Sequence, residues 1–156
     1  MEQHNIQHVV NFGCGDCAMW GHDQLDSRFT CIDVVPEILE IAKQNQPRAT
    51  FLLDQPIPPC DLILVKDVMI HWYDQEIADW FQQYRDHAPR MLIVERDIKW
   101  ESNPAEFTRM PRDEYLKQYG WIPIDFNKIT LDYSLVSLPD FAAKLFLIER
   151  KQNDIN

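Results

Sequence analysis

Apolar runs and helical periodicities alternate along this chain. Short apolar runs bounded by turn residues predict strands at about residues 6–12, 29–33, 49–53, 61–66 and 90–96. A helix is predicted to begin at Pro36, a residue that suits the first helical turn, with an apolar stripe of Ile38, Leu39, Ile41 and Ala42. A second helix is predicted over Asp74 to Tyr84, with a stripe of Ile77, Trp80, Phe81 and Tyr84. We expect that stripe to pack in the core rather than to form an aromatic binding surface.

The last part of the chain carries a weaker pattern. Residues 97–112, which contain Asn103-Pro104 and Met110-Pro111, are predicted to form a long loop. A third helix is predicted over Asp113 to Tyr119 and is ended by Gly120. Two strands, Lys128 to Val136 and Ala143 to Glu149, are expected to form an antiparallel pair.

The alternation of strands and helices predicts an α/β fold. We expect a Rossmann-like, doubly wound sheet that is mostly parallel, with an antiparallel last strand and a shortened N-terminus. The chain has 156 residues, which is enough for one substantial core, so residues 1–156 are taken as a single domain.

Composition and charge narrow the functional classes. The formal net charge of −10 disfavours nonspecific nucleic-acid binding, although a local basic groove stays compatible with it. No apolar run approaches the roughly 20 residues of a membrane span, and Met1 to His8 lack the apolar core of a signal peptide. We therefore expect a cytoplasmic protein without a membrane partner, whose cysteines are reduced thiols: Cys14, Cys17, Cys31 and Cys60.

The most informative segment is Asn11-Phe12-Gly13-Cys14-Gly15-Asp16, which follows the apolar run Ile6 to Val10. A strand, a Gly-x-Gly turn and a helix start let the backbone approach a ligand and aim free N–H groups at it. Asp33, about twenty residues further on, ends the next predicted strand and is placed to accept hydrogen bonds from ribose hydroxyls. The pair of signals predicts a nucleotide-like ligand.

Together with later segments, this region resembles the class I S-adenosylmethionine-dependent methyltransferases. Residues 9–16 look like their first motif, 31–42 their second, 51–54 their third and 61–72 their fourth, and 91–95 fit their fifth strand. The resemblance covers residues 6 to about 100, with the motifs in the family's order. It implies that the chain binds S-adenosylmethionine and methylates a small-molecule acceptor.

The resemblance also implies site residues. The Gly13–Gly15 turn would pass beneath the methionine part of the cofactor, Asp33 would bind the ribose, and Asp54 would accept a hydrogen bond from the adenine amino group. Asn11 stands where the family more often has an acid facing the methionine ammonium, so affinity is expected to be lower or Asp16 to serve instead. The implied cofactor-binding set is Asn11, Gly13, Cys14, Gly15, Asp16, Asp33, Val34, Asp54 and Lys66.

Methyl transfer needs donor and acceptor held in line and, for a weak acceptor, removal of a proton. His71 follows the fourth predicted strand and is the candidate general base, since imidazole can accept a proton near neutral pH. Asp67 is the candidate for orienting the substrate. The structural alternative is that His71 bonds to backbone at a helix start and that Asp67 caps a turn.

Two alternative functions are compatible with the turn Cys14-Gly15-Asp16-Cys17. A CxxC pair after a strand is also the position of a thioredoxin-like redox pair, and Cys31 or His22 added to it would suggest structural zinc. Both leave Asp33, Asp54 and the Asp67–His71 segment without a role, so we assign no metal site here. A third alternative is a noncatalytic subunit that binds S-adenosylmethionine and acts with a partner.

The sequence departs from the family pattern in two places, and each departure leads to a further prediction. About five residues precede the first predicted strand, whereas many relatives have helices there that cover the cofactor. We expect a second subunit, in a homodimer or with a partner protein, to cover the site.

The second departure is the short link Gln55 to Cys60. In a sheet of order 3-2-1-4-5 it must pass two neighbouring strands, which it can do only if nearly straight, at about 3.3–3.6 Å per residue. Its three prolines favour such a path, so the helix usual at this point should be missing.

Overall fold

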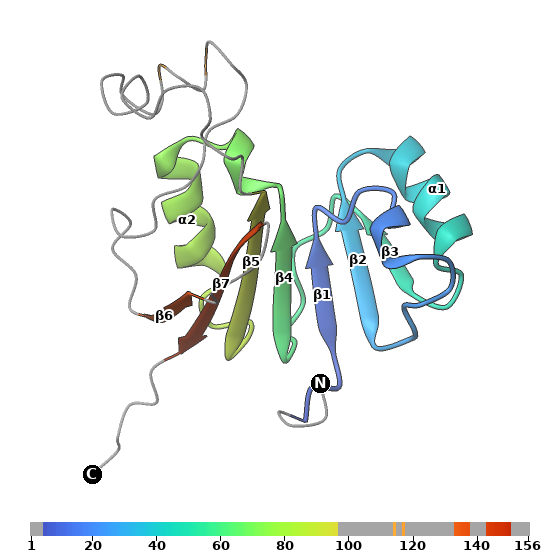
Figure 1. Cartoon of the computed structure of the whole chain (residues 1–156), viewed down its shortest axis with the longest axis horizontal. Helices are drawn as coiled ribbons and strands as arrows, with labels where there is room; N and C mark the ends of the chain where they lie inside the picture. Colours follow the sequence, from blue (N-terminus) through green and yellow to red (C-terminus); the bar gives the residue numbers. More distant parts are fainter. Residues whose placement is uncertain (1–4, 97–113, 115–116, 118–132, 138–142, 151–156) are drawn as a thin grey trace.

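The computed structural model of the chain describes residues 5–96, 133–137 and 143–150, together with residues 114 and 117. The described strands form one seven-stranded sheet, with helices beside it (Figure 1). In chain order the elements are β1 (Val9–Phe12), the 3₁₀ helix η2 (Ala18–Trp20), β2 (Phe29–Asp33), α1 (Pro36–Asn45), β3 (Thr50–Leu53), β4 (Leu62–Lys66), the 3₁₀ helix η3 (Met69–His71), α2 (Asp74–Tyr84), β5 (Arg90–Arg96), β6 (Tyr133–Ser137) and β7 (Ala143–Arg150).

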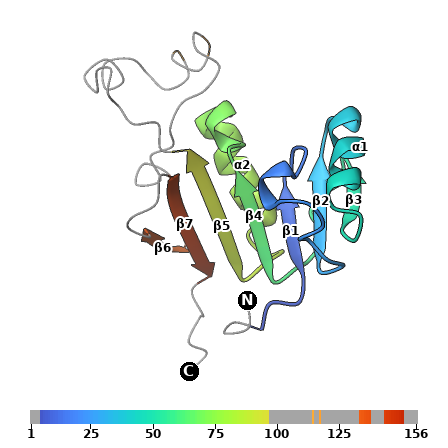
Figure 2. The same ribbon diagram turned by 45° about the vertical axis from the view of Figure 1, so that its right-hand side comes forward.

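The strand order is β3-β2-β1-β4-β5-β7-β6. Strands β1 to β5 are parallel to their neighbours, whereas β7 is antiparallel to both β5 and β6. Figures 1 and 2 show β7 beside β5 and pointing the opposite way. The predicted fold class, including the 3-2-1-4-5 order and the antiparallel last strand, is confirmed.

The predicted strands are confirmed with some changed boundaries. β1 begins at Val9 rather than at residue 6, because the N–H groups of Gln7 and His8 donate to Asp61 Oδ2 instead of to a neighbouring strand. β6 and β7 are the expected antiparallel pair. Residues 128–132 of the predicted strand lie outside the described residues, as do the loop over 97–112 and the helix over 113–119, apart from the helical residues 114 and 117.

Helices α1 and α2 pack on opposite faces of the sheet. Successive strand residues point to opposite faces, and Val10, Ile63 and Val65 form a core with Ile77 and Phe81 of α2. The alternate residues, such as Val9, Cys31 and Leu64, form a second core with Ala42 of α1. The stripe of α2 is buried, which confirms its predicted role in the core: Ile77, Trp80, Phe81 and Tyr84. Among the described residues no helix is long and apolar enough to cross a bilayer.

The link between β3 and β4 has no helix, as predicted. Ile57 is 1% exposed and sits in the core beneath α2, so it fills part of the space that a helix would cover. His87 Nδ1 lies 2.7 Å from the Ile57 carbonyl oxygen, and the Cys60 N–H donates to the His87 carbonyl. The extended link is therefore fixed by the Ile57 side chain and by two hydrogen bonds to His87.

The helix expected after the Gly-x-Gly turn is not an α-helix. Only η2, three residues long, follows the turn. Cys17, directly before η2, has φ 55° and Gly21, directly after it, has φ 77°. Left-handed residues interrupt a right-handed helix, so two of them confine this segment to one 3₁₀ turn. That expectation was wrong.

Candidate functional site

The carboxyl ends of four parallel strands meet at one edge of the sheet. Phe12 is paired with Ile32 of β2 and with Val65 of β4, so Gly13, Asp33 and Lys66 follow at one level across three neighbouring strands. Asp33 is in turn paired with Leu53, which places Asp54 one residue beyond it on β3. In open α/β sheets, ligands bind outside this edge.

The two glycines of the turn have different surroundings. Gly13 has φ +65°, and a Cβ added to it would clash with the Val68 side chain, so the segment after β4 packs directly on it. Gly15 has φ +57°, and a Cβ there would meet no atom within 4 Å. Gly13 is therefore required for packing, whereas the Gly15 backbone borders open space.

Asp33 ties this turn to β2. Its Oδ2 accepts a 2.9 Å hydrogen bond from the Gly15 N–H, and its Oδ1 accepts from the N–H groups of Val34 and Val35 at 2.8 and 3.1 Å. The N–H of Cys14 donates to the Ile32 carbonyl. The expectation that the turn aims free N–H groups at a ligand is therefore wrong for these two groups, because Asp33 and Ile32 take them. A carboxylate has about four acceptor positions, so a hydroxyl can still bind to Asp33.

The other candidates for the cofactor lie around Asp33. Val34 is 66% exposed, and Asp54 is exposed in a left-handed conformation at φ 47°. Asp16 is exposed, and its Oδ1 caps η2 by accepting from the Ala18 N–H. Asn11 is only 3% exposed and is paired with Cys31, on the face of the sheet that α1 covers.

The segment after β4 carries the catalytic candidates. Lys66 Nζ pairs with Asp67 Oδ2, and both side chains are partly exposed. Asp67 has φ 53°, and its N–H donates to the Val94 carbonyl. His71 is exposed at the end of η3, where its N–H donates to the Val68 carbonyl. Since Val68 contacts Gly13, the turn of η3 that carries His71 adjoins the glycine turn.

Sequence reasoning missed the residues that hold the loop behind the glycine turn. Gln46, the residue after α1, is 0% exposed, and its Oε1 accepts from the N–H groups of Gln24 and Leu25 at 2.8 and 2.9 Å. Its Nε2 donates to the carbonyls of Cys17 and Gly21. Asn45 Nδ2 donates to the Asp16 carbonyl at 2.9 Å. A polar residue at the end of a helix gives no sequence signal for such a role.

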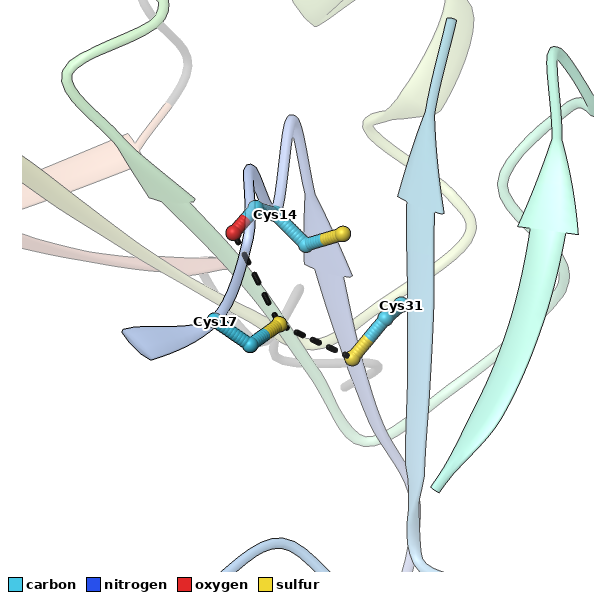
Figure 3. Close-up of side chains that lie close together, drawn as sticks. All are labelled: Cys14, Cys17 and Cys31. Carbon is cyan, nitrogen blue, oxygen red and sulfur yellow. Dashed lines mark hydrogen bonds between the residues drawn. The ribbon is translucent and has the colours of Figure 1, made fainter. Parts of the chain in front are cut away.

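Three of the four cysteines come together beside this turn. The sulfur atoms of Cys14, Cys17 and Cys31 all lie within 4.8 Å of one another, whereas His22 is not part of the cluster. Figure 3 shows Cys14 and Cys17 on the loop after β1 and Cys31 on β2. The neighbouring Cys14 and Cys31 side chains hold the pKa of the Cys17 thiol below its usual range. Burial raises the pKa of the separate Cys60 thiol to about 11.

Comparisons with known proteins support the fold but give no close relative. No protein-family model matches the chain, and no curated protein matches it. Among solved structures it is similar to the mitomycin 7-O-methyltransferase MmcR, with a TM-score of 0.64 and 17% identity over 95% of this chain and 50% of that one. An O-methyltransferase family protein from Burkholderia thailandensis gives 0.66 and 12% identity over 96% and 52%.

A third similar structure is magnesium protoporphyrin IX methyltransferase from Synechocystis PCC 6803 with bound SAH, at TM-score 0.61 and 13% identity, over 96% of this chain and 78% of that one. The chain has the class I S-adenosylmethionine-dependent methyltransferase fold. It spans about half the length of the first of these proteins.

Proposed function

We propose that the chain binds S-adenosylmethionine at the carboxyl edge of β1, β2 and β3 and transfers its methyl group to a small-molecule acceptor. One observation carries the proposal. The Gly15 backbone faces open space next to the Asp33 carboxylate, on a sheet of the methyltransferase fold. A nearby backbone without a side chain and an acceptor for ribose hydroxyls are what the middle of this cofactor requires.

The adenosine end would lie over β2 and β3. The exposed Val34 offers an apolar surface for the adenine ring, and the exposed Asp54 carboxylate offers an acceptor for the adenine amino group. Asp33 would bind a ribose hydroxyl at the acceptor position that its three backbone contacts leave. These positions agree with the roles that the resemblance implies.

The methionine end would lie over the glycine turn. Asn11 is buried and neutral, so it cannot supply the charge that an ammonium group favours. Asp16 is exposed in the same turn and carries that charge. We therefore assign the ammonium contact to Asp16 and the packing of the turn to Gly13, with Cys14 contributing backbone.

The sulfonium supplies an activated methyl group when the cofactor is bound, and the chain's residues position the acceptor. His71 is exposed beside the glycine turn and would accept the proton of a hydroxyl or amine acceptor. Asp67, held by Lys66, would orient that acceptor. Two further points stay predictions. One is the alternative that the chain is a noncatalytic subunit that binds S-adenosylmethionine, and the other is that a second subunit, in a homodimer or with a partner protein, covers the site.

The experiment that tests the binding site compares Gly15→Ala with Gly21→Ala. Both glycines have positive φ, +57° and +77°, so an alanine strains the backbone at either one. Only Gly15 borders the proposed cofactor. We expect Gly15→Ala to lower affinity for S-adenosylhomocysteine at least about tenfold, a loss of ~1.4 kcal/mol, and Gly21→Ala to keep it. Equal affinity in the two folded variants would contradict the proposed site.

A further inference from the structure

The cluster of Cys14, Cys17 and Cys31 has no role in the proposed methyl transfer. Two of its members come from the loop after β1 and the third from β2, so the fold brings residues 14 positions apart into contact. The sulfur atoms of Cys17 and Cys31 are 4.0 Å apart, and Cys17 Sγ also lies 3.7 Å from the Cys14 carbonyl oxygen. The three thiols face one common space (Figure 3).

Simple core packing accounts for Cys31 but not for the whole cluster. A free cysteine often behaves as a small buried hydrophobe, and Cys31 is 0% exposed in the middle of β2. Cys17, however, has φ 55°. The other non-glycine residues with positive φ in the described part of the chain are Asn5, Asp23, Asp54 and Asp67, residue types that tolerate this conformation. A cysteine in a left-handed position points to a requirement for its sulfur.

The geometry suits a thiophilic metal ion. Zinc lies about 2.3 Å from each thiolate, which sets sulfur atoms of a tetrahedral site about 3.8 Å apart. The Cys17–Cys31 separation of 4.0 Å is already near that value, and all three sulfur atoms lie within 4.8 Å of one another. Small rotations of the side chains would complete the site.

We propose that Cys14, Cys17 and Cys31 bind one zinc ion through three thiolates. Binding displaces the three thiol protons into solvent. The fourth position would be open to water on the side of Cys14, the partly exposed member of the cluster. The proposal is independent of the cofactor, since it rests only on the three sulfur atoms and the backbone that carries them.

Charge favours a divalent ion at this site over monovalent copper, which thiolates also bind. Three thiolates with zinc leave a net charge of −1, whereas with copper(I) they leave −2. The Asp33 carboxylate accepts a hydrogen bond from the Gly15 N–H, directly after Cys14, so additional negative charge is unfavourable here. An ion in this place would also fix Cys14 between the two glycines of the turn.

Cys60 provides a matched control. It is a partly buried thiol like Cys14 but is not part of the cluster, and it donates to the Leu62 carbonyl. The full chain would be expressed with added zinc and purified with a phosphine reductant and without chelators. Metal content would be measured by mass spectrometry for wild type, Cys14→Ser, Cys31→Ser and Cys60→Ser, with circular dichroism to check folding.

We expect one zinc per chain in wild type and in Cys60→Ser. Loss of a direct ligand should weaken affinity by more than the roughly 10–100-fold typical of outer-shell partners, in Cys14→Ser and Cys31→Ser alike. Cobalt(II) in place of zinc should give thiolate-to-metal charge-transfer absorption in wild type and Cys60→Ser, and that absorption should weaken in Cys14→Ser. Zinc should likewise raise the Tm of wild type and Cys60→Ser but not of Cys14→Ser.

Cys31 is fully buried, so if its variant does not fold, the result of Cys14→Ser decides the test. The proposal is overturned if folded wild type retains no zinc and shows no saturable cobalt spectrum. It is equally overturned if Cys60→Ser loses as much metal as Cys14→Ser. A Cys17–Cys31 disulfide found in metal-free wild type under the reducing preparation would also overturn it.

Discussion

Asp33 has two tasks at the end of β2. Its oxygens hold the Gly15, Val34 and Val35 N–H groups, and the same carboxylate is the proposed ribose acceptor. The first task shapes the turn and the second binds the cofactor, so a single substitution disturbs both. The sequence could predict the acid but not its hold on Gly15, because that contact depends on the register of β1 and β2.

Asp33→Ala should weaken binding of S-adenosylmethionine by roughly 1.5–3 kcal/mol, the usual value of hydrogen bonds to a charged group. Asp33→Asn should lose less, since one amide oxygen can still accept. Calorimetric titration of both variants measures the difference, with Asp79→Ala on the exposed side of α2 as the control. Unchanged affinity in Asp33→Ala would remove Asp33 from the site.

The proposed role of His71 as general base is tested by enzyme kinetics. If it is the general base, His71→Ala should lower kcat about 10²–10⁴-fold with a hydroxyl or amine acceptor. Cofactor affinity should be retained, and the pH–rate profile should lose one limb. Unchanged turnover, or a joint loss of binding and folding, would show that His71 only supports η3.

At the scale of elements, the end of α1 holds the loop that follows the glycine turn. Gln46 is buried and satisfies two backbone N–H groups, those of Gln24 and Leu25. In Gln46→Ala both donors would lose this acceptor, and the Leu25 N–H would be buried without a partner, which costs about 1–3 kcal/mol. We expect the free energy of unfolding to fall by about 2–4 kcal/mol in urea titrations.

Gln44→Ala is the matched control for that prediction, because Gln44 is exposed on the same helix. It should change the stability by no more than about 0.5 kcal/mol. A similar loss in both variants would contradict a stabilising role for the buried amide of Gln46.

Strands and long helices were predictable from periodicity, and the missing helix between β3 and β4 from length and prolines. The absence of an α-helix directly after the glycine turn was not predictable. It depends on Cys17 adopting a left-handed conformation, which the sequence does not mark as it marks glycine. Sequence reasoning offered Cys31 or His22 as a third member beside Cys14 and Cys17 but could not choose between them, since the contact with Cys31 needs the β1–β2 pairing.

At the scale of the whole molecule, the two ends of the parallel strands have different roles. The carboxyl edge carries the candidate site. At the opposite edge, Asp61 Oδ2 accepts from the Gln7 and His8 N–H groups, both at 2.8 Å, and joins the segment before β1 to the start of β4. These two hydrogen bonds lower the pKa of the Asp61 carboxyl.

A carboxyl whose pKa is lower in the folded state stabilises the protein above its unfolded pKa of about 3.9, and that stabilisation is lost as pH falls through the folded pKa. Asp61→Asn should therefore be less stable than wild type near pH 7. The difference should shrink as the pH falls below about 4. Urea unfolding across this range measures it, and a difference independent of pH would contradict the assignment.

The central claim is that the carboxyl edge of β1 to β3 binds S-adenosylmethionine. Calorimetric titration of the full chain with S-adenosylmethionine, and separately with S-adenosylhomocysteine, tests it most directly. We predict saturable binding of both at one site per chain, with a Kd below about 1 mM, the upper end of ordinary enzyme affinities. No saturable binding of either compound to the folded protein would contradict the account.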